Sequence, residues 1–366
     1  MATADAPAPS ETSPPALAPE VARRSRARRR LVAGVLTAFL VLAAGGLAAY
    51  ANGSLSSRYS AGQAALDYFA AMKRGDAVGV MANATFLRGA GTDDVLFGKE
   101  AVTSMLLLKS NTDINHVSVV SSNSVDSTTA NVKISMTWAG VDRTATYKVH
   151  RDPSQVHYLF YDSWRVDVPY ATISVAMPPH SGAFTVDGVF GRSGDSAAPV
   201  QVIEGYHQVT MVGTPFVDRD SKIANAVDAN PNVTFTGGIS ASAKAAVADI
   251  VHGWFTRCDA STHNWCPDHT YTAQDPGDVW YWSLAGYGNV YFTTYSYTID
   301  PDVMSGVSIV LTDTNKAKAN GTCKAILTVD GSRTYGFTGT WSTDLTADGS
   351  GISGSNGLWD CTKAAA

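Results

Sequence analysis

Apolar and polar residues follow two different periods along the chain, and the first of them is helical. Leu66, Phe69, Ala70 and Met72 lie on one face of a helix predicted over Ser60–Lys73. Gly75 follows at a position where glycine commonly ends a helix, because it adopts a left-handed backbone without strain. A second, short helix is predicted over residues 77–81.

A period of two replaces the helical period in the next hundred residues. The pattern predicts four strands, at residues 117–121, 131–138, 145–149 and 164–168. Gly140 marks a hairpin turn between the second and the third. Helices followed by an antiparallel meander favour an α+β fold with helices on one face of the sheet, and we assign this domain to residues 57–170.

The last third of the chain repeats this order of elements. A helix is predicted over Ser240–Arg257, with an apolar face at i, i+3, i+4 and i+7. Strands are predicted at residues 289–298, 307–312, 323–329 and 334–341. We therefore expect a second α+β domain over residues 239–366. Between the two domains, residues 171–217 predict a small β unit, and the polar residues 218–238 predict a linker.

The N-terminal fifty residues predict a membrane anchor. The proline-rich start favours a disordered cytoplasmic tail over residues 1–30, which ends in an arginine cluster. Leu31–Tyr50 carries no charge and as a helix would span about 30 Å, so a transmembrane helix is predicted over residues 31–51. The arginines place the N-terminus in the cytoplasm and the body outside the cell. The alternative is a signal peptide cleaved after Ala49-Tyr50-Ala51, although the 30-residue polar lead favours an anchor.

Charge and composition exclude two classes of protein. The 366 residues carry a net charge of −5, with 45% hydrophobic and 10% aromatic residues, which excludes a mostly disordered chain. Beyond residue 30, 21 basic and 29 acidic side chains remain, a net charge of −8. An acidic body gains nothing from phosphate backbones, so no nucleic-acid partner is expected.

All four cysteines lie in the last third of the chain. In an exported protein their even number predicts two disulfides, and of the three possible pairings we favour Cys258–Cys266 and Cys323–Cys361. A zinc site is the alternative, with ligands from His252, Cys258, His263, Cys266 and His269. Because this spacing matches no compact zinc motif, we expect no metal.

The sequence contains no nucleophile elbow, no S-x-x-K, no H-E-x-x-H and no P-loop, and we expect neither catalysis nor a cofactor.

The densest cluster of candidate functional residues is aromatic. The candidate ligand-binding residues are Trp280, Trp282, Tyr291, Tyr295 and Tyr297. Alternation along a strand from Asn289 predicts the three tyrosines on one face and Val290 and Phe292 on the other. Packing in a core is the alternative, since aromatic rings mostly serve that purpose.

Two segments resemble a known fold. Ala64–Asp76 is similar to the first helix and Gly-Asp turn of NTF2-like domains, and Trp164-Arg165-Val166 is similar to their closing strand. The membrane layout and the small β unit around Glu204–Thr210 resemble extracytoplasmic Gram-positive proteins of the TcaA type. The alanine-rich sequence suggests an actinobacterial origin. The resemblance implies tandem NTF2-like domains that face the cell wall.

Two functions therefore remain open at this point. The first is a non-enzymatic, single-pass membrane protein that binds a cell-wall component (peptidoglycan or a glycopeptide) or an envelope protein. The second is a structural part of an exported assembly, since TcpC-type conjugation proteins and Mce-associated proteins also join an anchor to NTF2-like domains. An NTF2-like isomerase or hydratase is the least favoured alternative.

Overall fold

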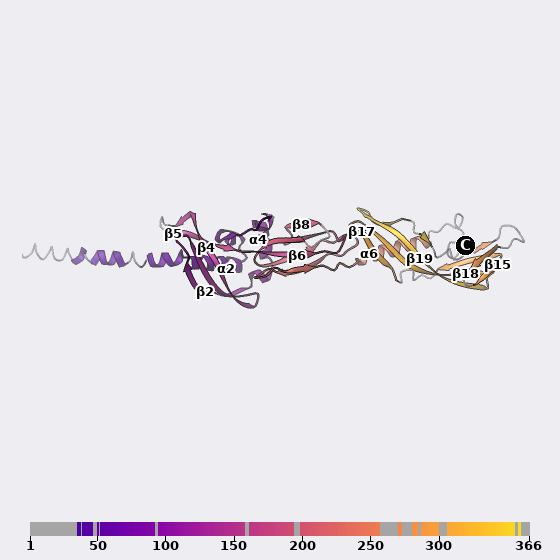
Figure 1. The fold of residues 1–366 in the computed structure, drawn as a ribbon, viewed down its shortest axis with the longest axis horizontal. Coiled ribbons are helices and arrows are strands. Elements are labelled where there is room, and N and C mark those ends of the chain that lie inside the picture. Colours follow the sequence, from indigo (N-terminus) through magenta and orange to yellow (C-terminus); the bar gives the residue numbers. More distant parts are fainter. Residues whose placement is uncertain are drawn as a thin grey trace, which may run out of the picture.

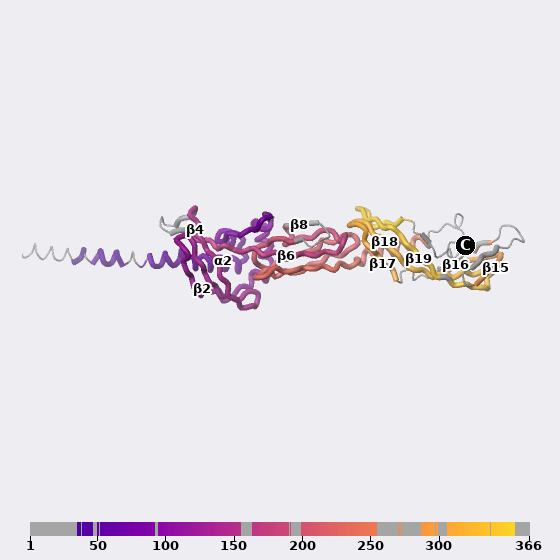
Figure 2. Tube along the Cα trace, in the orientation of Figure 1, coloured from indigo at the N-terminus to yellow at the C-terminus, as the bar shows by residue number. Residues whose placement is uncertain are grey.

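The structure is a computed structural model. It describes residues 35–37, 39–46, 50, 52–91, 94–157, 161–193, 198–256, 270–272, 280–284, 287–299, 306–355 and 358–359. The fold is mixed α+β with several sheets, and the elements follow one another along an elongated molecule (Figure 1). The first unit is indigo to magenta, the second magenta to orange and the third orange to yellow, so the three units stand in chain order along the long axis (Figure 2).

The N-terminal segment is helical at residues 35–37, 39–46 and 52–58. A membrane-spanning helix needs about 20 consecutive apolar residues. None of the helices in the described part of the chain has the length and apolarity to cross a membrane. The predicted anchor includes residues 31–34, 38, 47–49 and 51, which lie outside the described residues.

The first unit packs helices against a curved mixed sheet. Its elements are α2 (Ala61–Lys73), α3 (Ala77–Asn83), β1 (Ala84–Phe86), the 3-10 helix η1 (Asp94–Phe97), α4 (Lys99–Leu106), α5 (Lys109–Thr112), β2 (Ile114–Ser124), β3 (Thr129–Trp138), β4 (Val141–His157) and β5 (Tyr161–Val168). The sheet order is β1-β5-β4-β3-β2, with β1 parallel to β5 and the other pairs antiparallel. Helix α2 contacts β2, β3, β4 and β5.

The ends of α2 form as the sequence predicts. The Ser60 hydroxyl accepts a hydrogen bond from the Gln63 amide at 3.2 Å, which caps the start of the helix. Gly75 has a φ of 66° and donates to the Met72 carbonyl, while the Asp76 amide donates to the Ala71 carbonyl. These two bonds form a Schellman motif, which requires the left-handed glycine. The helix prediction is therefore confirmed to within one residue.

The second unit consists of two sheets. Its strands are β6 (Tyr170–Ala176), β7 (Ala183–Val186), β8 (Phe190–Ser193), β9 (Ala198–Ile203), β10 (Tyr206–Met211), β11 (Asp220–Asn225) and β12 (Asn232–Thr234). The sheet orders are β11-β10-β7-β8 and β12-β6-β9. Residues 218–238, for which a linker was predicted, contain β11 and β12 and complete both sheets. The linker prediction is wrong because edge strands expose most of their side chains, and the polar pattern of these residues reflects that exposure.

The third unit is built on one long hairpin. Its elements are α6 (Ala241–Thr256), β13 (Thr270–Thr272), β14 (Trp280–Leu284), β15 (Gly288–Phe292), β16 (Thr294–Ile299), β17 (Ser308–Asp313), β18 (Lys316–Val329), β19 (Arg333–Asp348), β20 (Gly351–Gly354) and β21 (Leu358–Trp359). β18 and β19 pair without interruption from Lys316↔Thr346 to Val329↔Arg333. The unit shares with the first the order of a helix before strands, but its described strand pairs are all antiparallel.

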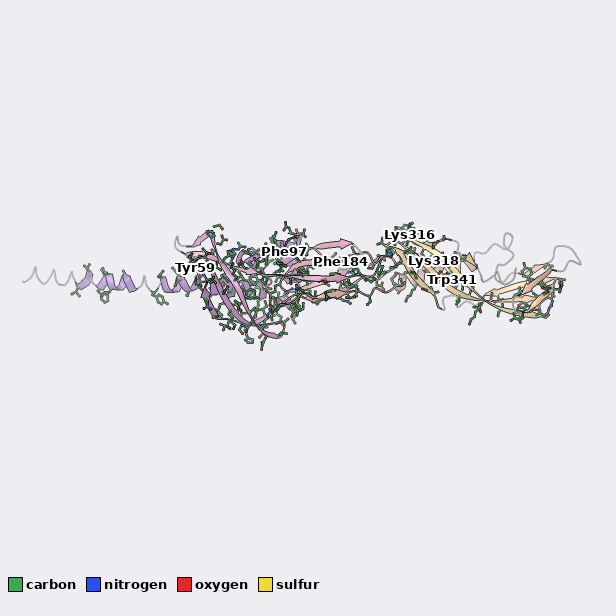
Figure 3. All side chains as sticks on the ribbon, in the orientation of Figure 1. Tyr59, Phe97, Phe184, Lys316, Lys318 and Trp341 are labelled. Atoms are coloured by element: carbon green, nitrogen blue, oxygen red, sulfur yellow. The ribbon has the colours of Figure 1, made fainter. Side chains whose placement is uncertain are left out.

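The first half of β18, residues 316–322, escaped prediction because its buried residues are small. Ala317, Ala319 and Gly321 are buried, and a Cβ added to Gly321 would lie 2.4 Å from Trp341 Cζ2. Trp341 in turn meets Trp254 of α6 edge to face, with ring centroids 6.3 Å apart. Small residues let these rings approach the sheet, and alanine and glycine carry a weak hydrophobic signal. Phe97, Phe184 and Trp341 mark the buried cores of the three successive units (Figure 3).

Candidate functional site

The turn between β9 and β10 enters the first unit and forms a joint between the two units. Gly205 lies at its tip with a φ of 156°. A Cβ added there would lie 3.0 Å from Asn111 Oδ1 and 3.2 Å from Met105 Sδ. The close approach of this turn to α4 and α5 therefore depends on glycine. η1 contacts β9 and α4 contacts β10, so the helices of the first unit meet both strands of the turn.

One fully buried amide holds this turn in place. Asn111 of α5 is 0% exposed and donates from Nδ2 to the carbonyls of Met105, at 2.7 Å, and Tyr206, at 2.6 Å. Its Oδ1 accepts from the Tyr206 amide at 2.7 Å. The side chain thus replaces the backbone partners that a β-strand neighbour would supply to Tyr206. Farther along β9, Gln201 Oε1 accepts from the Gly89 amide at 2.9 Å.

A buried charge cluster lies at the same joint. Glu204 is 5% exposed, and its Oε1 accepts from Arg143 Nη2 at 3.2 Å. Its Oε2 accepts from the Tyr147 hydroxyl at 3.2 Å. Arg143 also pairs with Asp228, in the loop between β11 and β12, whose side chain is 67% exposed. One guanidinium therefore serves two carboxylates, and its Nε and Nη1 atoms are buried with no partner.

Burial dominates the protonation of this cluster. It raises the pKa of Glu204 to about 7, against the opposing effect of Arg143, and the nearby Asp228 adds to the rise. Burial also raises the pKa of Tyr68 and Tyr147, so both phenols keep their protons at neutral pH. The joint thus contains one carboxyl group that exchanges its proton near neutrality.

Aromatic rings surround the cation of the cluster. The Arg143 guanidinium lies 5.1 Å from the ring centroid of Trp138, and the Trp138 ring lies 6.4 Å from that of Tyr206. Phe69 of α2 meets Trp138 and Tyr147 edge to face. These rings exclude water from the charges, which strengthens both the attraction within the Arg143 pairs and the cost of ionising Glu204.

A second buried ion pair supports the turn from the side of the sandwich. His207 Nδ1 lies 2.7 Å from Asp187 Oδ2, and His207 Nε2 lies 2.7 Å from the Ile203 carbonyl oxygen. Both ring nitrogens therefore lie within hydrogen-bond distance of oxygen atoms. Because Ile203 immediately precedes Glu204, this pair fixes the end of β9 from which Glu204 projects.

The arrangement is suited to holding two units together. Its charged groups bond to one another, and its buried hydrogen bonds join α5 and β4 of the first unit to the turn between β9 and β10. Within the described part of the chain, no three His, Cys, Asp or Glu side chains gather as a metal site would require. No sequence pattern marked Arg143 or Asn111 as functional, and Glu204 was named only as the first residue of a segment similar to TcaA-type proteins. The sequence did contain one signal for Glu204, because this charged residue directly follows the apolar run at the end of β9.

The structure divides the predicted aromatic surface. Tyr291 on β15 is 58% exposed, whereas Tyr295 on β16 is 2% exposed and packs against Phe292 with centroids 5.5 Å apart. The prediction that Tyr291 and Tyr295 share one face, opposite Phe292, is wrong, because the strand is interrupted at Thr293. β15 pairs with β14 and β16 pairs with β18.

Asp330 stabilises this interruption. Its Oδ1 accepts from the amides of Thr293 and Thr294 at 2.8 and 3.1 Å, and the first of these bonds is the largest cause that lowers its pKa to about 2. Its Oδ2 accepts from Arg333, which also donates to the Tyr291 carbonyl.

For the other three predicted ligand-binding residues, the structure describes the position of the backbone. Trp280 and Trp282 lie opposite Phe292 and Val290 in the β14–β15 ladder, and Tyr297 lies opposite Leu327 in the β16–β18 ladder. Their side chains lie outside what the structure describes, and ligand binding by these residues stays a prediction.

Of the four cysteines, Cys323 lies within the described residues. It is buried on β18 and is disulfide-bonded. Cys258, Cys266 and Cys361 lie outside the described residues, so the predicted pairing stays a prediction.

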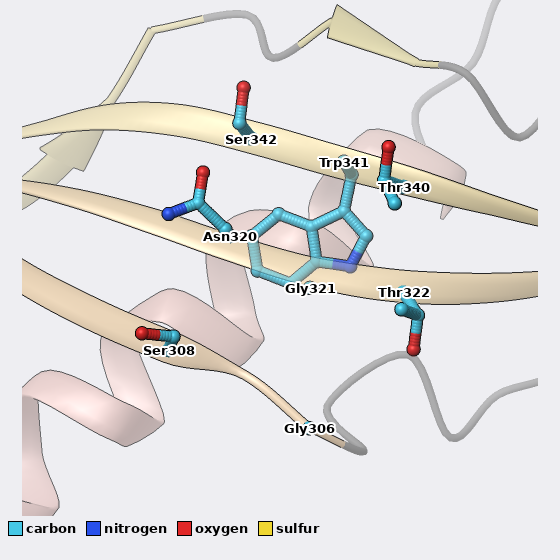
Figure 4. Close-up of a pocket in the computed structure, with 8 residues that line it drawn as sticks. All are labelled: Gly306, Ser308, Asn320, Gly321, Thr322, Thr340, Trp341 and Ser342. Carbon is cyan, nitrogen blue, oxygen red and sulfur yellow. The ribbon is translucent and has the colours of Figure 1, made fainter.

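An open depression of about 500 Å³ lies on the third unit at the crossing of β17, β18 and β19 (Figure 4). Its polar lining consists of Ser308, Asn320, Thr322, Thr340 and Ser342, which carry hydroxyl and amide groups and no formal charge. Trp341 lies across β18 at Gly321 beneath this lining (Figure 4).

Comparisons with known proteins add one distant similarity. No protein-family model matches the sequence, and no curated protein matches it. A solved structure described as "Ntf2 like protein involved in plasmid conjugation" is similar over 81% of this chain and 94% of that chain, with 10% sequence identity and a TM-score of 0.18. At this TM-score the similarity is too distant to assign a function, and the TcaA-type resemblance stays a prediction.

Proposed function

We propose that this protein is a membrane-anchored extracytoplasmic spacer that presents its third unit to the cell wall or to an envelope partner, without catalysing a reaction. The observation that carries the proposal is the buried joint around Asn111 and Glu204. Two units joined by buried hydrogen bonds and ion pairs move together, whereas units on a polar linker move independently.

The junction between the second and the third unit also supports the role of a stiff spacer. The Ser240 amide, just before α6, donates to the Phe216 carbonyl at 2.9 Å, and its hydroxyl donates to the Pro215 carbonyl at 3.2 Å. Val217 and Ile239 form an isolated antiparallel bridge. The chain therefore enters the third unit through backbone pairing. Three units with buried connections, in chain order along one axis, make a stiff spacer (Figure 1).

The depression on the third unit suits a polymer rich in hydroxyl groups. Ser308, Asn320, Thr340 and Ser342 offer uncharged donors and acceptors, which can form hydrogen bonds with the hydroxyl groups of a glycan strand. The net charge of −8 beyond residue 30 does not favour association with anionic lipid or nucleic acid.

Two experiments test the proposal in intact cells. External protease should remove a tag fused after Ala366 and leave a tag fused before Met1 intact until lysis. The opposite pattern would refute the extracytoplasmic placement. A photo-crosslinking amino acid at Thr340 should then capture wall polymer or an envelope protein, whereas the same group at Ser122, exposed on β2, should capture much less. Equal capture from both positions would refute presentation by the third unit.

A further inference from the structure

The charges at the first joint do not balance. Four ionisable groups face Glu204: Arg143 and Tyr147 from β4, Asp228 from the β11–β12 loop and Tyr68 from α2. With both phenols protonated, one cation meets two carboxylates, and the cluster carries a net charge of −1. His207 and Asp187 form a separate buried pair on the sandwich side of the turn.

Ionised Glu204 is costly because its carboxylate is buried, and Arg143, which pairs with it, also pairs with the mostly exposed Asp228. Glu204 and Arg143 have side chains that are 6% and 10% exposed, so water screens their charges poorly. A proton on Glu204 makes the cluster neutral. The neutral carboxyl group can still accept hydrogen bonds from Arg143 and Tyr147, while Arg143 keeps its ion pair with Asp228.

We propose that the joint between the first unit and the sandwich is a proton-controlled clamp, which binding of one proton at Glu204 tightens and its release loosens. The moving part is the turn that carries Glu204 and Gly205. In the tight state this turn is seated against Asn111 and Met105; in the loose state Glu204 reaches water and ionises without a penalty.

The strength of the coupling follows from the two environments of Glu204. Its pKa is about 7 in the seated turn, and the ordinary value of 4.5 applies when the turn is released. Linkage between these two values makes the seated state about tenfold more favourable at pH 6 than at pH 8.

Hydrogen exchange at the Tyr206 amide measures the clamp directly, because this amide donates to Asn111 Oδ1 only while the turn is seated. In the full-length protein, with intrinsic exchange rates corrected for pH, its protection should fall about tenfold from pH 6 to pH 8. The Phe235 amide, which bonds to the Ala176 carbonyl within the sandwich, serves as the internal reference and should not change. Equal protection of Tyr206 at both pH values would overturn the proposal.

Two variants isolate the responsible group. Glu204→Gln keeps the shape and the acceptor oxygen of the side chain without its charge, and the protection of Tyr206 should be high and equal at both pH values. Asp228→Asn balances the cluster while Glu204 is ionised, and the tenfold change should shrink to about threefold or less. This second variant alters a mostly exposed side chain and decides the question if Glu204→Gln does not fold. A tenfold change that persists in either variant would overturn the proposal.

Discussion

Replacing Asn111 by alanine removes a side chain that bonds to three backbone groups at the joint. The lost partners are the Met105 carbonyl and both backbone groups of Tyr206, at 2.6–2.7 Å. A hydrogen bond of this kind contributes about 0.5–1.5 kcal/mol net, and Asn111 has no access to water that could replace it. We therefore expect Asn111→Ala to lower the free energy of unfolding by about 2–4 kcal/mol.

Urea denaturation of the full-length protein, followed by tryptophan fluorescence, measures this loss. Trp138 reports on the joint because its ring lies 6.4 Å from that of Tyr206. The transition that includes Trp138 should move to lower urea concentration with little change in slope. The matched control is Asn115→Ala, which removes hydrogen bonds to Lys73 and Asp113 near the surface and should cost less than about 1 kcal/mol.

The two asparagines have the same size and chemistry and differ in burial and in what they join. If Asn111→Ala and Asn115→Ala destabilise the protein equally, or if Asn111→Ala lies within about 0.5 kcal/mol of the wild type, the buried amide does not hold the joint.

Three further outcomes are expected. The pKa of Glu204 is raised to about 7 in the folded state, so its contribution to stability is complete below about pH 4.5 and is lost as pH rises through 7. In urea titrations, the free energy of unfolding should fall by about 2–3 kcal/mol between pH 5 and pH 8. This fall should be absent in Glu204→Gln. Gly321→Ala forces a Cβ to within 2.4 Å of the Trp341 indole and should lower the stability measured in thermal melts by about 1–3 kcal/mol. The control Gly336→Ala has open space around its Cβ and should change stability by less than about 0.5 kcal/mol. The pKa of Asp330 is lowered to about 2, so its contribution to stability is present above about pH 4 and is lost as pH falls through 2. An NMR pH titration of its carboxyl carbon should show this low midpoint. A midpoint near 4 would contradict the hydrogen bonds that Asp330 accepts at the β15–β16 junction.

Local signals predicted the elements whose ends are determined by neighbouring residues. Ser60 and Gly75 bracket α2 because capping and a left-handed turn act within a few residues of the chain. The same holds for α6, where the Ser240 hydroxyl accepts from the Ala243 amide at 3.0 Å.

Alternation failed where a distant residue changes the backbone. The tyrosine pattern predicts one strand face, but the strand is interrupted at Thr293. Asp330, which is 37 residues from Thr293 and 36 residues from Thr294 in sequence, bonds to both amides at this interruption. A break of one residue reverses the face of every side chain that follows it. The prediction of a linker over the polar edge strands failed for a related reason. β11 and β12 become strands only through their pairing with β10 and β6 in the sandwich.

The amino-acid sequence alone determined α2, α3 and α6, most of the strands of the first unit and the uncharged segment that follows the arginine cluster, because each depends on side chains within a few turns of one another. It did not predict the short helices α4 and α5, of which α4 contacts the sandwich strand β10 and α5 carries Asn111. The joint was decided by the tertiary structure. Glu204 lies 61 residues from Arg143 and Tyr206 lies 95 residues from Asn111 in sequence, and they meet only when the sandwich packs against the first unit. The environment that moves the pKa of Glu204 to about 7 is created by that packing, since burial and a shared guanidinium are properties of the folded chain.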